Sequence, residues 1–142
     1  MENNKFKLTF LSLSENELFA RNVIALFALK LNPSISELSD IKTAVSEAVT
    51  NCIVHAYPNS AGEIILDCEI IDNTLHINVC DNGVGIEDVN KAQEPFFTTK
   101  PEDERSGMGF TIINSFMDKM SINSNLNGGT KVYMAKTIKA EN

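Results

Sequence analysis

The chain has 142 residues, enough for one domain with a real core, and 43% of them are hydrophobic, which excludes an intrinsically disordered chain. Its formal net charge of −7 argues against nucleic acid as a main partner, because phosphate backbones are bound by basic surfaces. No apolar run approaches the ~20 residues of a membrane span, and the N-terminus lacks a signal-peptide pattern. We therefore expect a cytoplasmic protein with a single domain over residues 1–142 that binds neither nucleic acid nor membranes directly.

Three cysteines, Cys52, Cys68 and Cys80, are widely spaced, and each lies in an apolar run. The sequence contains no Cys-x-x-Cys pair. This pattern favours small buried hydrophobic side chains over a disulfide or a metal site.

The first part of the chain predicts one strand followed by two helices. Residues 6–10 alternate apolar and polar side chains, as a strand does. The SENE stretch has the sequence of a capping box, in which Ser14 caps a helix and Glu17 reaches back to it, and a helix is expected over 15–31. A second amphipathic helix is expected from about residue 34 to a stop signal at 57–60.

The remaining elements are two pairs of strands, with helices and one long loop between the pairs. Residues 94–108 are polar and contain proline and glycine, and a compact domain rarely carries such a loop without a use, of which a lid is the commonest. The order of elements predicts an α+β fold, a two-layer α/β sandwich with helices on one face of a mixed, mostly antiparallel sheet. The other predicted elements are strands over 63–71, 74–80, 121–126 and 131–138 and helices over 88–93 and 109–120.

An acidic residue followed by two glycines ends the third predicted strand. Asp81 can fix one polar contact, and Gly83 and Gly85 allow backbone to approach a flat ligand closely. Taken alone, this pattern is more often a plain strand-to-loop turn.

Three polar residues, Glu47, Asn51 and His55, follow one another at i+4 spacing and share one stripe of the second predicted helix. An asparagine oxygen can ligate Mg²⁺, and a glutamate one turn away can accept a hydroxyl proton. The alternatives are a solvated glutamate and a histidine that only makes structural hydrogen bonds.

A second glycine pair, Gly107 and Gly109, opens the third long helix. Free N–H groups at a helix start form an anion site, and Lys100 and Arg105 nearby can neutralise phosphates. A flexible helix start explains the same glycines equally well. Thr130, after a glycine turn, either belongs to that hairpin or returns a hydroxyl to the Asp81 loop.

Together, these motifs resemble those of the Bergerat-fold ATPases and kinases, the superfamily of gyrase and the histidine kinases. The stretches 46–51, 95–101 and 105–112 are most similar to the anti-sigma-factor serine-protein kinases, the sporulation members in particular. No helical hairpin with a phosphoacceptor histidine precedes the motifs, unlike in a histidine kinase.

The resemblance implies a Bergerat ATP-binding fold with an ATP lid at about 94–108 and Mg-ATP as cofactor. Asp81 would hold the adenine amino group, Thr130 would support the same pocket, Asn51 would bind Mg²⁺, and Glu47 would be the catalytic base acting on a substrate serine. The implied ATP-binding residues are Asn51, Asp81, Gly83, Gly85, Ile86, Thr99, Lys100, Arg105, Ser106, Gly107, Met108, Gly109, Phe110 and Thr130.

The resemblance also implies the partners. A sigma factor would be held inactive by the ATP-loaded homodimer, and an anti-anti-sigma protein would be inactivated by phosphorylation. The alternative functions are a nucleotide-sensing anti-sigma module with negligible kinase activity, and an ATPase or detached histidine-kinase catalytic domain.

Overall fold

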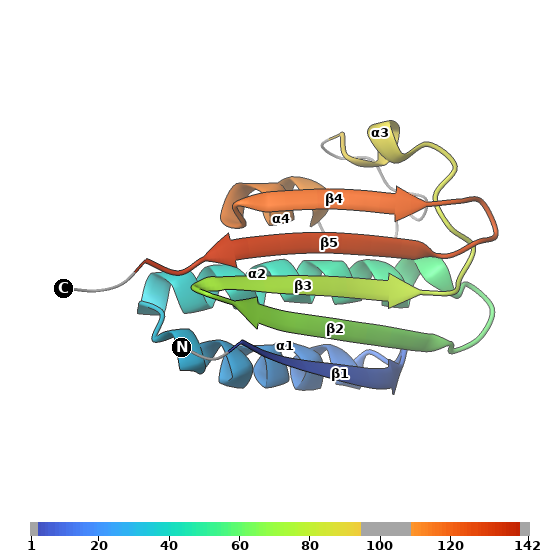
Figure 1. The fold of residues 1–142 in the computed structure, drawn as a ribbon. Helices are drawn as coiled ribbons and strands as arrows, with labels where there is room; N and C mark the ends of the chain where they lie inside the picture. Colours follow the sequence, from blue (N-terminus) through green and yellow to red (C-terminus); the bar gives the residue numbers. More distant parts are fainter. Residues whose placement is uncertain (1–2, 95–108, 140–142) are drawn as a thin grey trace.

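The computed structural model describes residues 3–94 and 109–139, and Figure 1 shows a sheet with its helices packed behind it. This arrangement is the predicted two-layer α+β sandwich, with α1, α2 and α4 on one face. The elements are β1 (Asn4–Leu11), α1 (Glu15–Ala28), η1 (Leu29–Leu31), α2 (Ile35–Asn51), η2 (Cys52–Ala56), β2 (Glu63–Ile71), β3 (Thr74–Asp81), α3 (Val89–Ala92), α4 (Gly109–Phe116), β4 (Lys119–Ser124) and β5 (Thr130–Thr137).

The strands form one sheet in the order β1-β2-β3-β5-β4. All four pairings among the described strands are antiparallel. The predicted sheet was mixed and mostly antiparallel, and the mixed part of that prediction is wrong for these strands. The connections explain this result. Two helices between β1 and β2 return the chain in the opposite direction, and short turns containing Asp72 and Asn127, both with positive φ, join β2 to β3 and β4 to β5.

Side-chain alternation along the strands places one apolar face against the helices. On β3, Leu75, Ile77 and Val79 are fully buried, and the residues between them are partly exposed. Asp81 continues this buried face at the end of the strand and is only 7% exposed. An ionisable group therefore lies at the border of the hydrophobic core, where it needs hydrogen-bond partners.

Two capping sequences of the same type behave differently. At α2, the Ser34 hydroxyl accepts from the Glu37 amide at 3.0 Å, and the Glu37 carboxylate accepts from the Ser34 amide at 2.9 Å, which completes a capping box. At α1, the predicted box is wrong because Ser14 makes no side-chain cap. The Glu17 carboxylate instead accepts a hydrogen bond from Ser46 on α2 and pairs with Arg21 at 3.6 Å.

Some helix boundaries differ from the prediction. The regular part of α1 ends at Ala28 and continues as a short 3-10 turn, and α4 ends at Phe116 instead of reaching residue 120. Asp118 explains the second difference. Its amide donates to the Ala135 carbonyl at 2.9 Å and its carboxylate accepts from the Thr137 amide at 2.7 Å, which fixes the chain beside β5 and starts β4 early.

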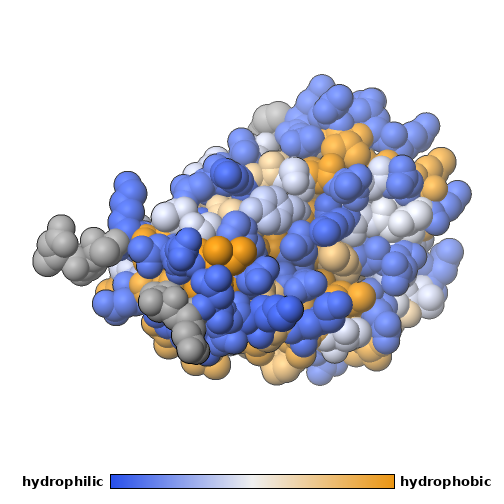
Figure 2. All heavy atoms as spheres, viewed as in Figure 1, coloured by the Kyte–Doolittle hydropathy of each residue, from blue (hydrophilic) through white to orange (hydrophobic). Residues whose placement is uncertain are grey.

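The outward face of the sheet is mainly hydrophilic, as Figure 2 shows in the same view. β1 lies at the sheet edge, but its apolar side chains Phe6, Leu8 and Phe10 pack against the core. Exposed apolar surface lies instead on α1, where Leu18 is 52% and Leu26 is 68% exposed. Within the described ranges, no helix has the length and apolar character needed to cross a membrane.

Candidate functional site

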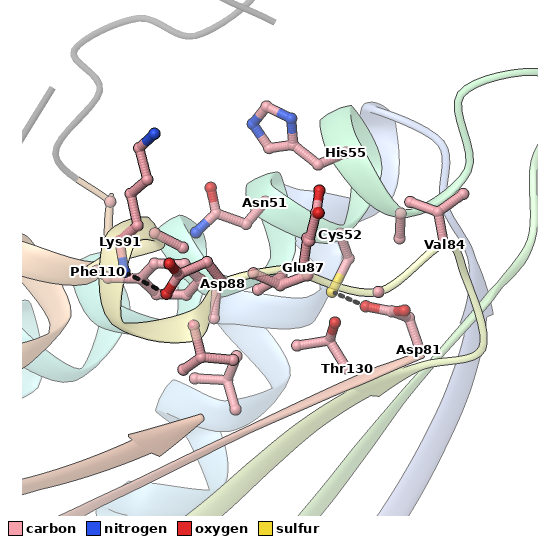
Figure 3. A pocket seen from close by; sticks show the side chains of 18 of the residues that line it. Asn51, Cys52, His55, Asp81, Val84, Glu87, Asp88, Lys91, Phe110 and Thr130 are labelled. Carbon is pink, nitrogen blue, oxygen red and sulfur yellow. Dashed lines mark hydrogen bonds between the residues drawn. The ribbon is translucent and has the colours of Figure 1, made fainter. Parts of the chain in front are cut away.

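A cavity of about 1040 Å³ lies between the helix layer and the loop that follows β3. Its size is that of a site for a small molecule or cofactor. The inner end of the cavity is formed by Ala48, Cys52, Asp81, Thr130 and Val132, and the outer end by Asn51, His55, Lys91, Gly109 and Phe110. Figure 3 shows Asp81 and Thr130 at one side of the site and Asn51, Lys91 and Phe110 at the other.

Asp81 is held by two protein donors at the inner end. Its Oδ1 accepts from the Gly83 amide at 2.9 Å, and its Oδ2 accepts from the Cys52 thiol at 3.4 Å (Figure 3). A carboxylate has about four lone-pair sites, so these contacts fix its orientation and leave acceptor capacity for a ligand. The inner end therefore presents a buried, oriented acceptor.

Cys52 is buried, as predicted, and has a polar function that the sequence pattern did not reveal. Burial and then the charge of Asp81 raise the pKa of the Cys52 thiol well above its usual value. The thiol therefore stays protonated and remains a donor to the carboxylate. It lies in η2, a π-helical turn that follows α2 directly, and such turns are frequent at functional sites.

Ser124, at the end of β4, links three segments around the inner end. Its hydroxyl accepts from the Ile86 amide at 2.8 Å, donates to the Gly129 carbonyl at 2.9 Å and contacts the Thr130 hydroxyl at 2.8 Å. No motif in the sequence marks Ser124, because its partners come together only when β4 and β5 pair.

Gly83 is required by packing inside the protein. A β-carbon at Gly83 would lie 2.1 Å from the Ala56 carbonyl oxygen, which no side chain can accommodate. The next amide, that of Val84, donates to the same Ala56 carbonyl at 2.9 Å. The loop after β3 is thus joined directly to the end of η2, and Gly83 itself does not line the cavity.

Tyr57 supports the same loop from outside the cavity. Its hydroxyl accepts from the Asn82 amide at 2.8 Å and donates to the Glu63 carbonyl at 2.6 Å. The ring fills the space beside Gly62, where a β-carbon would lie 2.3 Å from it. Burial raises the pKa of Tyr57, with a smaller contribution from the Asp81 charge, so the hydroxyl keeps the proton that it donates.

The outer end brings Glu47, Asn51 and Gly109 together. A β-carbon on Gly109 would lie 3.0 Å from Asn51 Nδ2, 3.3 Å from Asn51 Oδ1 and 3.4 Å from Glu47 Oε2. Because glycine has none, the start of α4 can lie close beside two polar side chains, and Gly109 lines the cavity although it is buried. The amides at a helix start favour an anion.

The outer end is rich in acidic groups. Glu87, Asp88 and Glu94 line the cavity there, with Lys91 as the only lysine or arginine among the described lining residues. The Asp88 carboxylate accepts from the Lys91 amide at 3.0 Å and caps the short helix α3 (Figure 3). An anionic ligand at this end would need further cations to neutralise it.

The predicted ATP-binding residues fall into three groups. The cavity is lined by Asn51, Asp81, Gly85, Ile86, Gly109, Phe110 and Thr130. Gly83 lies behind the cavity wall, and Glu47 lies beside Asn51 without lining the cavity. Outside the described residues are Thr99, Lys100, Arg105, Ser106, Gly107 and Met108, together with most of the predicted lid.

Comparison with known proteins identifies the fold and the family. Residues 15–136 match the family described as "Histidine kinase-like ATPase domain". The fold is similar to the catalytic domain of histidine kinase ThkA, with a TM-score of 0.58, 20% identity and coverage of 99% of this chain and 100% of that one. It is also similar to a Mycobacterium tuberculosis structure of RsbU and RsbW domains, with a TM-score of 0.71, 17% identity and coverage of 97% of this chain and 33% of that one.

Closer sequence relatives narrow the class. The chain is 56% identical over 136 residues to an anti-sigma F factor of Caldanaerobacter subterraneus, covering 96% of this chain and 95% of the relative. It is 50% identical to an anti-sigma F factor of Clostridium acetobutylicum, with 96% and 95% covered. The chain therefore belongs to the histidine kinase-like ATPase domain family, in the branch formed by the anti-sigma F factors.

Proposed function

We propose that this protein is an anti-sigma factor and a protein serine kinase that binds Mg-ATP, inhibits a sporulation sigma factor and phosphorylates an anti-anti-sigma protein. The observation that carries the proposal is the grouping of Glu47, Asn51 and Gly109 at the outer end of a cavity whose inner end presents Asp81. The names of the relatives support the anti-sigma part.

The inner end suits a purine base. The walls around Asp81 are apolar, with Ala48 and Val132 almost fully buried. The Asp81 carboxylate accepts hydrogen bonds only, which complements the exocyclic amino group of adenine. Binding here would orient the nucleotide so that its phosphates extend towards Asn51 and α4.

Asn51 fits the role of a magnesium ligand. Its amide oxygen lies beside the side-chain-free Gly109, and no group of three or more His, Cys, Asp or Glu side chains arranged to hold a metal occurs in the described part of the chain. Mg²⁺ commonly binds one or two protein oxygens and completes its shell with water and substrate phosphates. The bound ion would neutralise phosphate charge, which the acidic outer end cannot do.

Glu47 is placed to act on an incoming hydroxyl. Its carboxylate lies one helical turn from Asn51 and close to the start of α4. A carboxylate in this position would accept the proton of a substrate serine as the serine oxygen attacks the terminal phosphate. Lys100 and Arg105 of the lid would provide the missing positive charge at this end.

The partner surfaces follow from the exposed groups. α1 and the η1 turn after it present the apolar side chains Leu18, Phe19, Leu26 and Leu29, each at least half exposed, which is unusual for a free helix surface. We assign this surface to protein contacts, either within a homodimer or with the sigma factor. A protein that binds a sigma factor acts in the cytoplasm, where that factor meets RNA polymerase.

Phosphotransfer to a protein substrate tests the proposal directly. The purified chain is incubated with labelled Mg-ATP and the anti-anti-sigma protein encoded near it, and the labelled residue is mapped by mass spectrometry. We expect a single phosphoserine in the substrate, formed far more slowly with Glu47→Gln. Sigma-factor capture without phosphoserine would leave the nucleotide-sensing anti-sigma module and exclude the kinase.

A further inference from the structure

The Ser124 hydroxyl has three polar neighbours and only one proton. The Gly129 carbonyl, at 2.9 Å, can only accept, and the Ile86 amide, at 2.8 Å, can only donate. The Thr130 hydroxyl, at 2.8 Å, can do either. If the Ser124 proton goes to Gly129, its two lone pairs are left for Ile86 and Thr130, and every polar atom in the group is satisfied.

The alternative, in which Ser124 donates to Thr130, leaves the Gly129 carbonyl with only the longer bond from the Asn125 amide, at 3.4 Å. The better-satisfied arrangement therefore has Thr130 donating to Ser124, so that Thr130 offers its remaining lone pairs to the cavity, where Figure 3 shows its hydroxyl. Asp81 has no proton to donate and already accepts from Gly83 and Cys52. The two polar side chains at the inner end thus both accept.

We propose that Ser124 is a specificity-determining positioning residue, which takes the Thr130 proton and thereby restricts the base site to ligands that donate. The inference rests on the proposed function, because it concerns which triphosphate that site binds. A base with an amino group at this position, as in adenine, would be favoured. A base with a carbonyl oxygen there, as in guanine or hypoxanthine, would bring two acceptors together.

Ser124 does not line the main cavity and touches no ligand position in it. It therefore acts through Thr130 and Ile86, and its loss has two separable effects. Loss of the Ile86 contact loosens the loop and weakens the binding of all nucleotides equally. Loss of the Thr130 contact lets that hydroxyl rotate and donate, which changes the preference between bases.

A double-mutant cycle on base preference separates these effects. Dissociation constants for Mg-ATP and for Mg-bound purine riboside triphosphate, which lacks the 6-amino group and keeps the same N1 acceptor and the same triphosphate, are measured by calorimetry for the unmodified chain, Ser124→Ala, Thr130→Val and the double variant. We expect the unmodified chain to prefer ATP by roughly 10–100-fold and Ser124→Ala to lose about 3–10-fold of that preference. In the Thr130→Val background, Ser124→Ala should leave the preference unchanged.

The controls cover folding and general structural loss. Ser121→Ala removes a hydroxyl from an exposed position of the same strand and should leave both affinities unchanged. If Ser124→Ala does not fold, Ser124→Cys replaces the strong hydroxyl acceptor by a weak sulfur one and should show the same loss of preference.

Two results would overturn the inference for different reasons. Equal weakening of both triphosphates by Ser124→Ala, with an unchanged ratio, would show that Ser124 only supports the loop. Failure of the unmodified chain to bind either triphosphate would refute the proposed nucleotide site itself, and the inference would fall with it.

Discussion

The two ends of the cavity differ in how completely the described residues build them. At the inner end, Asp81 and Thr130 are already hydrogen-bonded to Gly83, Cys52 and Ser124, and the walls are buried. At the outer end, the described lining includes three acidic side chains and one lysine, so the charge there is unfavourable for a triphosphate.

Under the proposed function, the two ends would serve different parts of the nucleotide. The prearranged acceptor site would recognise the base at little reorganisation cost, since its groups already have their hydrogen bonds. The phosphate end would depend on Mg²⁺ and on the predicted cations Lys100 and Arg105. Base recognition and phosphotransfer should therefore fail separately when each end is changed, and the following predictions test this separation.

The largest effect is expected from Glu47→Gln at the outer end. The change keeps the shape of the side chain and removes the base, so phosphotransfer should fall by roughly 10²–10⁴-fold. Mg-ATP affinity and sigma-factor capture should persist, because Glu47 does not line the cavity. The measurements are phosphoserine formation, calorimetry with Mg-ATP and sigma-factor pull-down on the same protein.

Asn51→Ala is the matched comparison for Glu47→Gln. It removes the proposed metal ligand one turn along α2, so binding and phosphotransfer should decline together. Undiminished phosphorylation by Glu47→Gln would remove Glu47 from the mechanism. A loss of ATP binding by Glu47→Gln would show that the two functions of the outer end are not separable.

The next largest effect is expected from Asp81→Asn at the inner end. The substitution replaces one acceptor oxygen by an NH₂ group, which would face a hydrogen-bond donor. One unpaired buried polar contact has a free-energy cost that corresponds to a fall in ATP affinity of about one to two decades. Calorimetry measures this change directly. Asp72→Asn, in the exposed β2–β3 turn where asparagine tolerates the positive φ, should bind ATP normally. Equal ATP binding by the Asp81→Asn and unmodified proteins would refute the assignment of the base site.

Local patterns predicted most of the fold, because strand alternation and tight turns act within a few residues. The strand over 63–71 matches β2, and Asp72-Asn73 after it, a typical tight-turn sequence, joins β2 to β3. Capping shows the limit of such patterns. Ser14 and Ser34 begin the same type of sequence, yet only Ser34 forms the box, because Glu17 is drawn to Ser46 on the neighbouring helix.

The residues that line the cavity were predictable where residue type and spacing mark them, and unpredictable where a position depends on contacts between distant segments. Asp81, Asn51 and Gly109 have typical residue types at typical spacings. Cys52 has the composition of a core residue, and its contact with Asp81 spans 29 positions. Ser124 has no distinguishing sequence context, since its importance arises from the pairing of β4 with β5.

Tyr57→Phe should produce a smaller effect that tests whether the inner end is supported from outside. The variant keeps the ring beside Gly62 and loses the hydroxyl that joins Asn82 to Glu63. The free energy of unfolding should fall by about 1–2 kcal/mol, the value of one or two net hydrogen bonds. Urea denaturation measures this change. Tyr133→Phe, on the outward sheet face where the hydroxyl contacts the His76 ring at 2.7 Å, is the control for loss of a phenol hydroxyl. A Tyr57→Phe protein as stable as the unmodified chain would show that the loop does not need this support.

The smallest effect is expected from Glu37→Gln, at the opposite end of the helix that carries Asn51. Burial raises the pKa of Glu37, but hydrogen bonds from the Ser34 and Lys139 amides outweigh it and hold the pKa below its usual value. Because the pKa is lower in the folded protein, the stabilisation is present above the unfolded pKa and is lost as the pH falls through the folded one. Near neutral pH, the free energy of unfolding of the unmodified protein should be higher than that of Glu37→Gln by at most about 0.5 kcal/mol, since solvent screens a partly exposed carboxylate. The difference should vanish in acid. Denaturation at several pH values measures this difference.

The same variant should leave nucleotide affinity unchanged, because α2 has 17 residues and its two ends are therefore ~25 Å apart. A change in ATP affinity would mean that the helix transmits the loss of its cap to Asn51, and the ends of the cavity would then not be independent of the scaffold.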